Sequence, residues 1–388
     1  MNGMARVDAV LREAVESGAV PGVAAAAGNR AGTLYEGAFG RRALDGEAPM
    51  TPDSVVWIAS MTKAITTAAA LQQVEEGRLA LDEPIARVLP ALAAPRVLEG
   101  FDAEGAPILR PARRQVTLRH LLSHTAGFGY DFFNAEIGRY MEREGVPGII
   151  TCRRAALETP LVAEPGERWE YGTGIDWAGL AVEAVTGRRL DAVLEERILG
   201  PLGMRDTGFR LRPGQRERLA AMHARGPDGA LSVIPFEVPQ EPEFHMGGGG
   251  LYGTAPDYLR FARMILNGGT LDGVRILSPQ SVEEMRRNQI GALTVGMLRS
   301  AQPAATNDAE FFPGMVKRWS LGFLINEDDV PGGRAAGSLA WAGLGNTYYW
   351  IDPRRDLAGV LVTQILPFAD PRVLDLLGAF ERALYAGR

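Results

Sequence analysis

Apolar residues follow two different periods along the first forty positions. Over residues 1–20 they recur every three or four positions among charged ones, which predicts an amphipathic helix. Two short apolar runs follow at 22–27 and 33–39, with the turn-forming residues Asn29-Arg30-Ala31-Gly32 between them. This arrangement predicts a β-hairpin.

Helical spacing dominates the middle of the chain. We expect a helix from Met61 to about Gly77, because glycine is the usual residue just past a helix C-terminus. Other apolar stripes begin at a capping residue or stop at a glycine, and they predict helices over 118–123, 175–186, 190–199 and from 255 onward. Prolines interrupt the helical spacing of 80–98, while 101–114 indicates a loop and 213–245 shows few clear elements.

The last third of the chain changes to short apolar runs separated by Gly, Pro, Asp and Asn. These runs predict strands over 319–325, 339–341, 347–351 and 357–363, before a final helix at about 371–385. Strands at both chain ends with helices between them predict an α/β (α+β) fold. Its antiparallel sheet would combine N- and C-terminal strands flanked by helices.

The same pattern predicts how the lobes are divided. We expect one compound domain over 1–388, since no repeat or low-complexity linker separates independent units. Its α/β lobe would take about 1–80 and 300–388 with part of 175–245, and the remaining middle segments would form a mainly helical lobe.

Composition excludes several classes of protein. The 388 residues are 46% hydrophobic with a net charge of -6, and no basic stripe with interleaved aromatics indicates a nucleic-acid partner. The one cysteine, Cys152, excludes an internal disulfide. No apolar run is long enough for a membrane span and no signal peptide is evident, so we expect a cytoplasmic protein. The oligomeric state does not follow from the sequence.

The strongest candidate for chemistry is Ser60-Met61-Thr62-Lys63. A helix starting near Met61 places the serine hydroxyl and the lysine stem on one face, where they can exchange a proton. The chain has two lysines, Lys63 and Lys317, against 39 arginines. A guanidinium stays protonated, so arginine could not serve as the base. The alternative is a solvated lysine at a helix start, but the apolar residues that follow favour a buried helix, and buried lysines are uncommon.

Two other motifs carry weaker signals. His120 and His124 have the spacing of a metal pair, but they lack the associated glutamate and a third ligand, so packed histidines are the favoured interpretation. The run 247–250 consists of four glycines without the Gly-Lys-Ser/Thr of a phosphate loop, and we interpret it as a close chain reversal. We expect neither a metal nor a cofactor.

Aromatic residues gather in two turn-rich stretches. Tyr171 lies in a glycine-bracketed turn, which indicates a positioned side chain. In the segment 128–133, Phe128 and Tyr130 either line a substrate pocket or fill the core, and the sequence favours neither.

Taken together, Ser60-Met61-Thr62-Lys63, Tyr171-Gly172-Thr173 and Trp341-Ala342-Gly343 resemble the serine β-lactamase and penicillin-binding-protein superfamily. The chain is most similar to the class C β-lactamase-related esterases, the family VIII carboxylesterases, and the likeness extends over nearly its whole length. The resemblance implies a β-lactamase/transpeptidase-like fold.

The resemblance also implies a role for each motif. Ser60 would be the acylated nucleophile, Lys63 its hydrogen-bonded partner, and Tyr171 would share the general-base role with Lys63. The backbone amides of Ser60 and Leu344 would form the oxyanion hole. Trp341 and Gly343 would border the substrate pocket together with Phe128, Tyr130 and Thr173.

Two departures from the family pattern bear on the substrate. Trp341-Ala342-Gly343 replaces the Lys-Thr-Gly that meets a substrate carboxylate in β-lactamases, so a buried carboxylate would stay unpaired. Thr173 stands where related enzymes often have asparagine. We therefore expect a carboxylesterase that acts on small, neutral, short-chain esters. The alternatives are an acyltransferase or promiscuous β-lactamase using the same site, and a non-catalytic ligand-binding or scaffold member.

Overall fold

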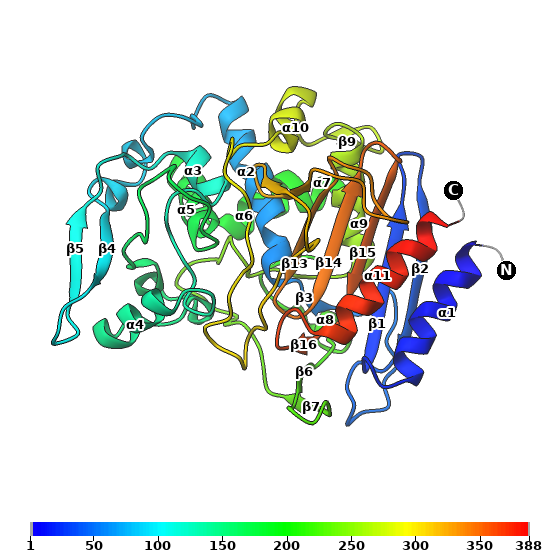
Figure 1. Cartoon of the computed structure of the whole chain (residues 1–388). Helices are drawn as coiled ribbons and strands as arrows, with labels where there is room; N and C mark the ends of the chain where they lie inside the picture. Colours follow the sequence, from blue (N-terminus) through cyan, green and yellow to red (C-terminus); the bar gives the residue numbers. More distant parts are fainter. Residues whose placement is uncertain (1–2, 387–388) are drawn as a thin grey trace.

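The computed structural model describes residues 3–386, and a seven-stranded antiparallel sheet forms its centre (Figure 1). The strand order is β11-β12-β13-β14-β15-β1-β2. The strands are β11 (Lys317–Trp319), β12 (Leu324–Asn326), β13 (Leu339–Gly343), β14 (Thr347–Asp352), β15 (Leu357–Val362), β1 (Gly22–Gly28) and β2 (Thr33–Gly40). N- and C-terminal strands meet where β1 pairs with β15, with Ala25 opposite Leu361. The sheet predicted from the two chain ends is therefore confirmed.

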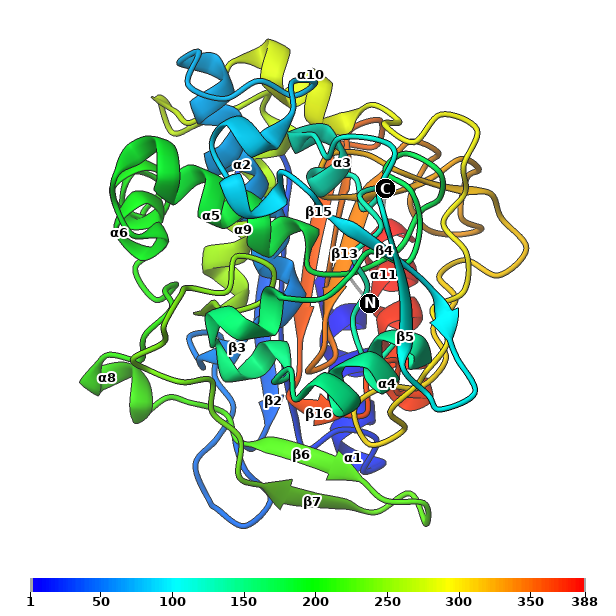
Figure 2. The same cartoon turned by 90° about the vertical axis from the view of Figure 1, so that its left-hand side faces the viewer.

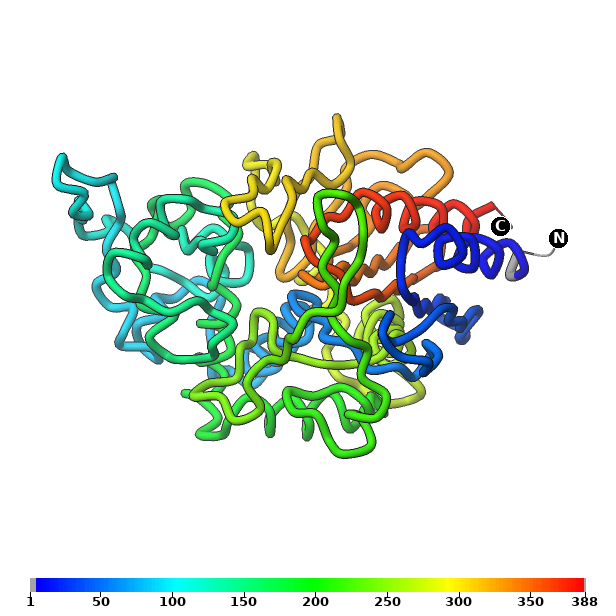
Figure 3. Tube along the Cα trace, turned by 90° about the horizontal axis from the view of Figure 1, so that it is seen from below, coloured from blue at the N-terminus to red at the C-terminus, as the bar shows by residue number. Residues whose placement is uncertain are grey.

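Helices cover both faces of this sheet. The first helix, α1 (Gly3–Glu16), lies beside the last, α11 (Pro371–Tyr385), on one face, as the view from below shows (Figure 3). On the other face α9 (Ala255–Leu266) packs against β15 and β1. The apolar stripe of each helix thus meets the apolar side chains of the sheet, which is the burial that stabilises a layered fold.

A mainly helical region stands beside the sheet, with a hairpin at its far end (Figure 1), and Figure 2 shows the same region facing the viewer. Its principal helices are α2 (Thr62–Glu75), α3 (Leu118–Leu122), α4 (Ala135–Glu144), α5 (Gly174–Thr186) and α6 (Leu190–Leu194). The other helices are α7 (Gly200–Leu202), α8 (Pro213–Arg216) and α10 (Pro279–Arg286), with single-turn segments at Ile85–Arg87, Pro90–Leu92, Ile149–Thr151, Arg154–Leu157 and Glu195–Leu199. The smaller strands are β3 (Val56–Trp57), β8 (Tyr252–Gly253), β9 (Thr270–Leu271), β10 (Val274–Arg275) and β16 (Ile365–Leu366).

Three segments differ from the sequence prediction. The first is 319–325, where the single strand expected is divided between β11 and β12, which pair with each other across a turn. Strands β4 (Arg96–Phe101) and β5 (Pro107–Pro111) form a hairpin where helical spacing and a loop were expected. The prolines of β5 sit at its two ends, where a missing N–H costs no ladder bond, so they bound the strand instead of breaking it. A second hairpin, β6 (Met222–Arg225) with β7 (Leu231–Ile234), occupies part of 213–245. Both hairpins are short and half-exposed, so the alternation of apolar and polar residues along their strands is weak.

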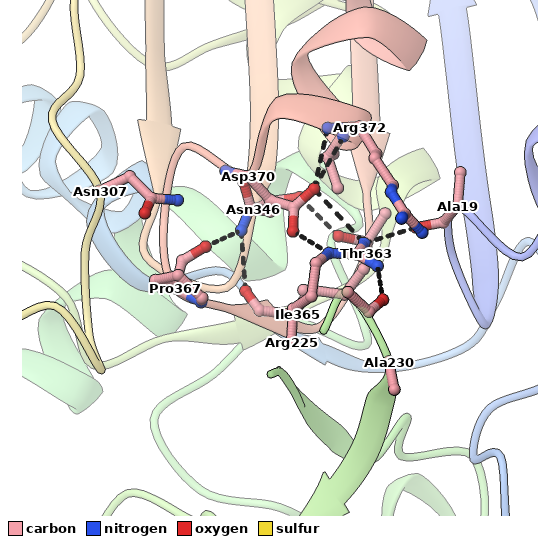
Figure 4. Close-up of polar contacts among 12 residues, drawn as sticks. Ala19, Arg225, Ala230, Asn307, Asn346, Thr363, Ile365, Pro367, Asp370 and Arg372 are labelled. Carbon is pink, nitrogen blue, oxygen red and sulfur yellow. Dashed lines mark hydrogen bonds and ion pairs between the residues drawn. The ribbon is translucent and has the colours of Figure 1, made fainter. Parts of the chain in front are cut away.

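Buried polar contacts anchor the start of α11 (Figure 4). Asp370 caps the helix by accepting hydrogen bonds from the amides of Arg372 and Val373, and it forms an ion pair with Arg225. The side chain of Asn346 donates to the carbonyls of Ile365 (2.8 Å) and Pro367 (2.9 Å). These bonds fix the turn between β13 and β14, which carries Leu344.

No helix between residues 3 and 386 combines the length and the apolar character that crossing a membrane requires.

Candidate active site

Ser60 lies in a tight turn immediately before α2. The segment Ala59–Met61 forms one 3₁₀ turn, and Ala59 has a left-handed φ of 45°. This conformation is unfavourable for a residue with a Cβ, so the surrounding structure must hold it in place. Part of that support is the short pair β3–β8, followed by the Ile58 amide donating to the Leu251 carbonyl over 3.0 Å. Helix α2 begins and ends close to the positions predicted for it.

Lys63 is completely buried as the second residue of α2, one helical turn after Ser60, and its side-chain nitrogen contacts three oxygen atoms. Nζ lies 3.1 Å from Ser60 Oγ, 3.1 Å from the Tyr130 hydroxyl and 2.6 Å from the Gly248 carbonyl. The predicted contact between Ser60 and Lys63 is therefore present. Tyr130, expected either to line a pocket or to fill the core, contacts the lysine directly.

Tyr130 connects Lys63 to a buried carboxylate. Its hydroxyl donates to Asp176 Oδ2 over 3.2 Å, and Asp176 Oδ1 accepts from the Gly248 amide over 2.8 Å. Asp176 is fully buried on α5, and this burial raises the pKa of its carboxyl, while the Lys63 cation opposes the shift. Burial and the neighbouring Asp176 charge hold the pKa of Tyr130 well above its usual range.

The four-glycine run explains how the chain comes this close. A Cβ built on Gly248 would lie 2.4 Å from Asp176 Oδ2 and 2.9 Å from the Tyr130 hydroxyl. Any side chain at this position would displace the carboxylate. The close chain reversal predicted for 247–250 is thus observed, and it serves the environment of Lys63.

Tyr171 flanks Lys63 from the other side. Lys63 Nζ lies 4.7 Å from the centroid of the Tyr171 ring, while the tyrosine hydroxyl accepts a 2.9 Å hydrogen bond from Trp341 Nε1. The predicted proximity of Tyr171 and Lys63 is present, with the cation facing the ring. The prediction did not include the bond to Trp341.

His124 packs against this tyrosine. The ring centroids of His124 and Tyr171 are 4.7 Å apart, and His124 Nδ1 accepts from the Gly172 amide over 3.4 Å. Burial, assisted by the Lys63 cation, lowers the pKa of His124 well below its usual value, so the imidazole is neutral at pH 7. His120 instead receives a hydrogen bond from the Thr117 amide at the start of α3. Within residues 3–386, no three His, Cys, Asp or Glu side chains gather closely enough to hold a metal ion.

Gly343 brings β13 against the nucleophile. A Cβ on Gly343 would lie 2.3 Å from the Ile58 carbonyl oxygen, so the two backbones approach more closely than any other residue would permit. Leu344 follows directly and lines the space beside Ser60. The assignment of the Ser60 and Leu344 amides to an oxyanion hole stays a prediction that this placement supports.

Two small hollows open on either side of Ser60. Tyr171, Trp341, Gly343 and several apolar side chains line the first, whose additional members are Phe132, Phe133, Leu298, Ala342, Leu344 and Phe368. Tyr130 lines the second, together with Trp57, Ala59, Phe132, Ile149, Ile150, Met246, Gly248, Gly249 and Leu344. Neither set, within the described chain, includes a charged side chain. Phe132 and Phe133 belong to the aromatic segment 128–133, for which a pocket and the core were both considered. Leu298 and Phe368 were not predicted, because nothing in their local pattern places them near Ser60.

Two residues expected in the pocket lie elsewhere. The Phe128 ring stacks on Trp177 of α5, with centroids 6.1 Å apart, and therefore fills core. Thr173 is buried at the start of α5, where its hydroxyl has no hydrogen-bond partner among the described residues. Neither residue lines the two hollows beside Ser60.

A fully buried lysine in contact with a half-buried serine and flanked by two tyrosines, beside a central antiparallel sheet, is the arrangement of a serine hydrolase. The comparison with known families agrees. The Beta-lactamase family model matches residues 7–383, and the chain belongs to this family. The superfamily and the fold predicted from the three motifs are confirmed.

Several relatives are similar over nearly the full chain. Monacolin J acid methylbutanoyltransferase of Aspergillus terreus is 34% identical over 98% of this chain and 95% of its own. Lovastatin esterase of Penicillium rubens is 34% identical over 98% of both chains. The solved structure of unliganded simvastatin synthase (LovD) from Aspergillus terreus superimposes with a TM-score of 0.86 at 32% identity, covering 100% of this chain and 98% of that one. The chain is therefore related to both hydrolases and acyltransferases.

Proposed function

We propose that this protein hydrolyses neutral carboxylic esters with short acyl groups through an acyl-enzyme on Ser60. The observation that carries the proposal is the 3.1 Å contact between Ser60 Oγ and the buried Lys63 Nζ. A serine hydroxyl is a weak nucleophile at neutral pH, and an adjacent group that accepts its proton makes attack possible. The two hollows beside Ser60 are small, about 10 and 20 Å³, and therefore favour the smallest acyl groups.

The contacts of Lys63 indicate where the serine proton goes. The Gly248 carbonyl can only accept, and Tyr130 accepts from Lys63 because its own proton points to Asp176. Two N–H groups of Lys63 therefore donate to Gly248 and Tyr130, and the third position on Nζ faces Ser60. A neutral amine takes the serine proton at this position. If Lys63 is an ammonium ion, the serine proton goes instead to the phenolate of Tyr171. The indole N–H of Trp341 and the charge of Lys63 would stabilise this phenolate.

The reaction then follows two balanced steps. Ser60 Oγ bonds to the ester carbonyl carbon, and the oxyanion is stabilised by the amides of Ser60 and Leu344, each worth about 2.7 to 4 kcal/mol in related sites. The carbon–alkoxide bond breaks, and the proton taken from Ser60 passes to the departing alcohol. Water next attacks the acyl carbon and gives up a proton to the same base. The bond between this carbon and Ser60 Oγ then breaks, and the base returns the proton to Ser60 Oγ, which releases the acid and restores the serine.

The walls around Ser60 favour neutral substrates. Trp341 occupies a place where a cation would meet a carboxylate, and it lies in a lining without charged side chains. A buried unpaired carboxylate costs several kcal/mol, so penicillins and cephalosporins are disfavoured. This distinguishes the proposed activity from that of a β-lactamase.

Acyl transfer to an alcohol is the second candidate. Its support is the likeness to a methylbutanoyltransferase together with apolar hollows that a non-aqueous acceptor could fill. Both activities share the Ser60 acyl-enzyme and differ in what attacks it. Only the fate of the acyl group separates them.

The test follows the acyl group and the leaving group together. p-Nitrophenyl butyrate is supplied to wild type and Ser60→Ala with increasing 1-butanol, and butyric acid and butyl butyrate are quantified against nitrophenol. Hydrolysis predicts acid as the main product at low alcohol, while transfer predicts ester that exceeds acid at millimolar alcohol. Turnover of nitrocefin without turnover of the ester would indicate a β-lactamase instead of an esterase. Equal rates for wild type and Ser60→Ala would contradict the role of Ser60 as nucleophile.

A further inference from the structure

A second, larger cavity of about 330 Å³ lies over β12, β13 and β14 beside α11. This size falls within the range of small-molecule binding sites, about 300 to 1,000 Å³. Its walls are mainly apolar and come from Phe311, Phe312, Pro313, Leu324, Val330, Ala340, Trp341, Tyr348, Tyr349, Leu374, Leu377 and Gly378. Figure 1 shows α11 crossing the same face of β14.

The charged residues of this cavity are already paired. Arg334 donates to both carboxylate oxygens of Glu381, over 2.9 and 2.6 Å, and Lys317 donates to Glu310 over 3.2 Å. A charged ligand would have to compete with these partners for each contact. The cavity therefore suits an uncharged apolar group.

Aromatic rings form the wall between this cavity and the hollow at Ser60. Trp341 borders both spaces. Phe311, which lines the larger cavity, contacts Trp341 with ring centroids 5.3 Å apart, and its centroid lies 6.3 Å from that of Phe368, which lines the hollow. The two spaces are thus separated by the thickness of a side chain.

Of Trp341, Phe368 and Phe311, the three rings in this wall, Phe311 is the least buried. Trp341 is held by its hydrogen bond to Tyr171 and is buried. Phe311 is half-buried, and apolar ring contacts hold it in place. Rotating such a ring breaks no polar interaction, so it costs less than moving the indole.

We propose that the larger cavity is a distal acyl site. It receives the apolar end of acyl chains that are too long for the hollow at Ser60, and Phe311 stands at the passage and sets the chain length at which the rate falls. This inference rests on the proposed ester hydrolysis and assigns the substrate class of the same site. Each methylene that enters an apolar cavity stabilises the bound chain, so opening the passage favours long chains selectively.

The test measures kcat/KM for p-nitrophenyl acetate, butyrate, octanoate and decanoate. For Phe311→Ala we expect the decanoate-to-acetate ratio of kcat/KM to rise at least tenfold over wild type. Phe101→Ala, at the far end of the molecule on β4, is the matched control and should leave this ratio unchanged. If Phe311→Ala lacks a cooperative unfolding transition, Phe311→Leu is used with an expected rise of about threefold.

A second substitution identifies the space that the chain enters. Leu377 lines the far side of the larger cavity on α11 and does not border the hollow at Ser60. In the Phe311→Ala background, Leu377→Trp fills the cavity and should return the ratio to within twofold of wild type. A ratio that does not rise in Phe311→Ala, or a rise that survives Leu377→Trp, would overturn the distal acyl site. Absence of Ser60-dependent acetate turnover would instead count against the proposed hydrolysis itself.

Discussion

Trp341 donates its indole N–H to the hydroxyl oxygen of Tyr171 over 2.9 Å. Trp341 stands where the family pattern has a lysine, so the pocket lacks that cation. The same residue instead provides a neutral hydrogen-bond donor to Tyr171, the proposed base. We predict that Trp341→Phe, which keeps an aromatic ring and deletes the donor, lowers kcat/KM for p-nitrophenyl butyrate about 10- to 100-fold. A hydrogen bond to a charged group is worth about 1.5 to 3 kcal/mol.

Trp350 offers a matched control for this change. Its indole N–H donates to Tyr385 over 3.2 Å on the α11 side of the sheet. Trp350→Phe should lose about as much stability as Trp341→Phe but keep kcat/KM near the wild-type value. Equal losses of activity in both variants would show that the effect of Trp341→Phe is structural.

The pair Asp176 and Tyr130 should act as one unit on Lys63. Asp176→Asn places an amide N–H against the Tyr130 oxygen, which then accepts from the amide in competition with Lys63. We predict that each of Asp176→Asn and Tyr130→Phe lowers kcat about 10- to 100-fold with little change in KM, since both disturb the lysine and not the substrate walls.

A double-mutant cycle checks this coupling. The combined variant should be no slower than the worse single variant, with a coupling energy of about 1 kcal/mol or more. Circular dichroism and unfolding in urea show whether each variant is folded. Additive losses would mean that the two residues act independently.

Gly343 should tolerate no side chain. Gly343→Ala puts a methyl group 2.3 Å from the Ile58 carbonyl oxygen, and neither backbone can move without shifting Ser60 or Leu344. Overpacking of this kind costs about 1 to 3 kcal/mol, and a displacement of about 1 Å at a catalytic group reduces the rate about 100-fold. Gly296→Ala meets no atom within 4 Å and is the control. Urea unfolding and ester turnover of both variants test the prediction.

Asp257 gives a prediction about pH. It accepts hydrogen bonds from the Asp206 amide (2.7 Å) and the Thr207 hydroxyl (2.9 Å), but burial raises the pKa of its carboxyl to about 6. Between this value and the usual 3.8, the folded state holds a proton that the unfolded state lacks. The free energy of unfolding contributed by Asp257 therefore rises as the pH falls through 6.

Asp257→Asn removes this contribution and keeps an acceptor. The difference in unfolding free energy, wild type minus variant, should increase by up to about 3 kcal/mol between pH 7 and pH 4, from 1.36 kcal/mol per pKa unit. Urea titrations at four pH values measure it. A difference that is constant with pH would contradict the raised pKa.

The parts of the site that depend on local spacing could be predicted from the sequence. Ser60 and Lys63 are one helical turn apart, so their contact follows from the helix alone. The motif resemblance extended the site to Tyr171 and Trp341, although their hydrogen bond joins positions 170 residues apart. No local pattern could predict that bond, because it depends on how β13 packs against the helical region.

Asp176 had a signal that the sequence analysis did not use. It is a carboxylate in the first turn of the largely apolar helix α5, followed by a run of apolar residues, and a carboxylate in such a place is buried only with specific partners. Tyr130 had no comparable signal, since an aromatic in a glycine-rich loop fits core and pocket equally well. The strands at the chain ends were predictable from their apolar runs, whereas the hairpin β4–β5 was hidden by prolines that bound its second strand.

The most direct test of the central claim is covalent labelling of the nucleophile. Wild type and Ser60→Ala are incubated with a fluorophosphonate and analysed by intact-mass and peptide mass spectrometry. We predict a single adduct on wild type within the peptide that contains Ser60, formed more slowly when excess p-nitrophenyl butyrate is present, and no adduct on Ser60→Ala. An unlabelled wild-type protein, or an adduct that persists in Ser60→Ala, would contradict the assignment of Ser60 as the acylated nucleophile.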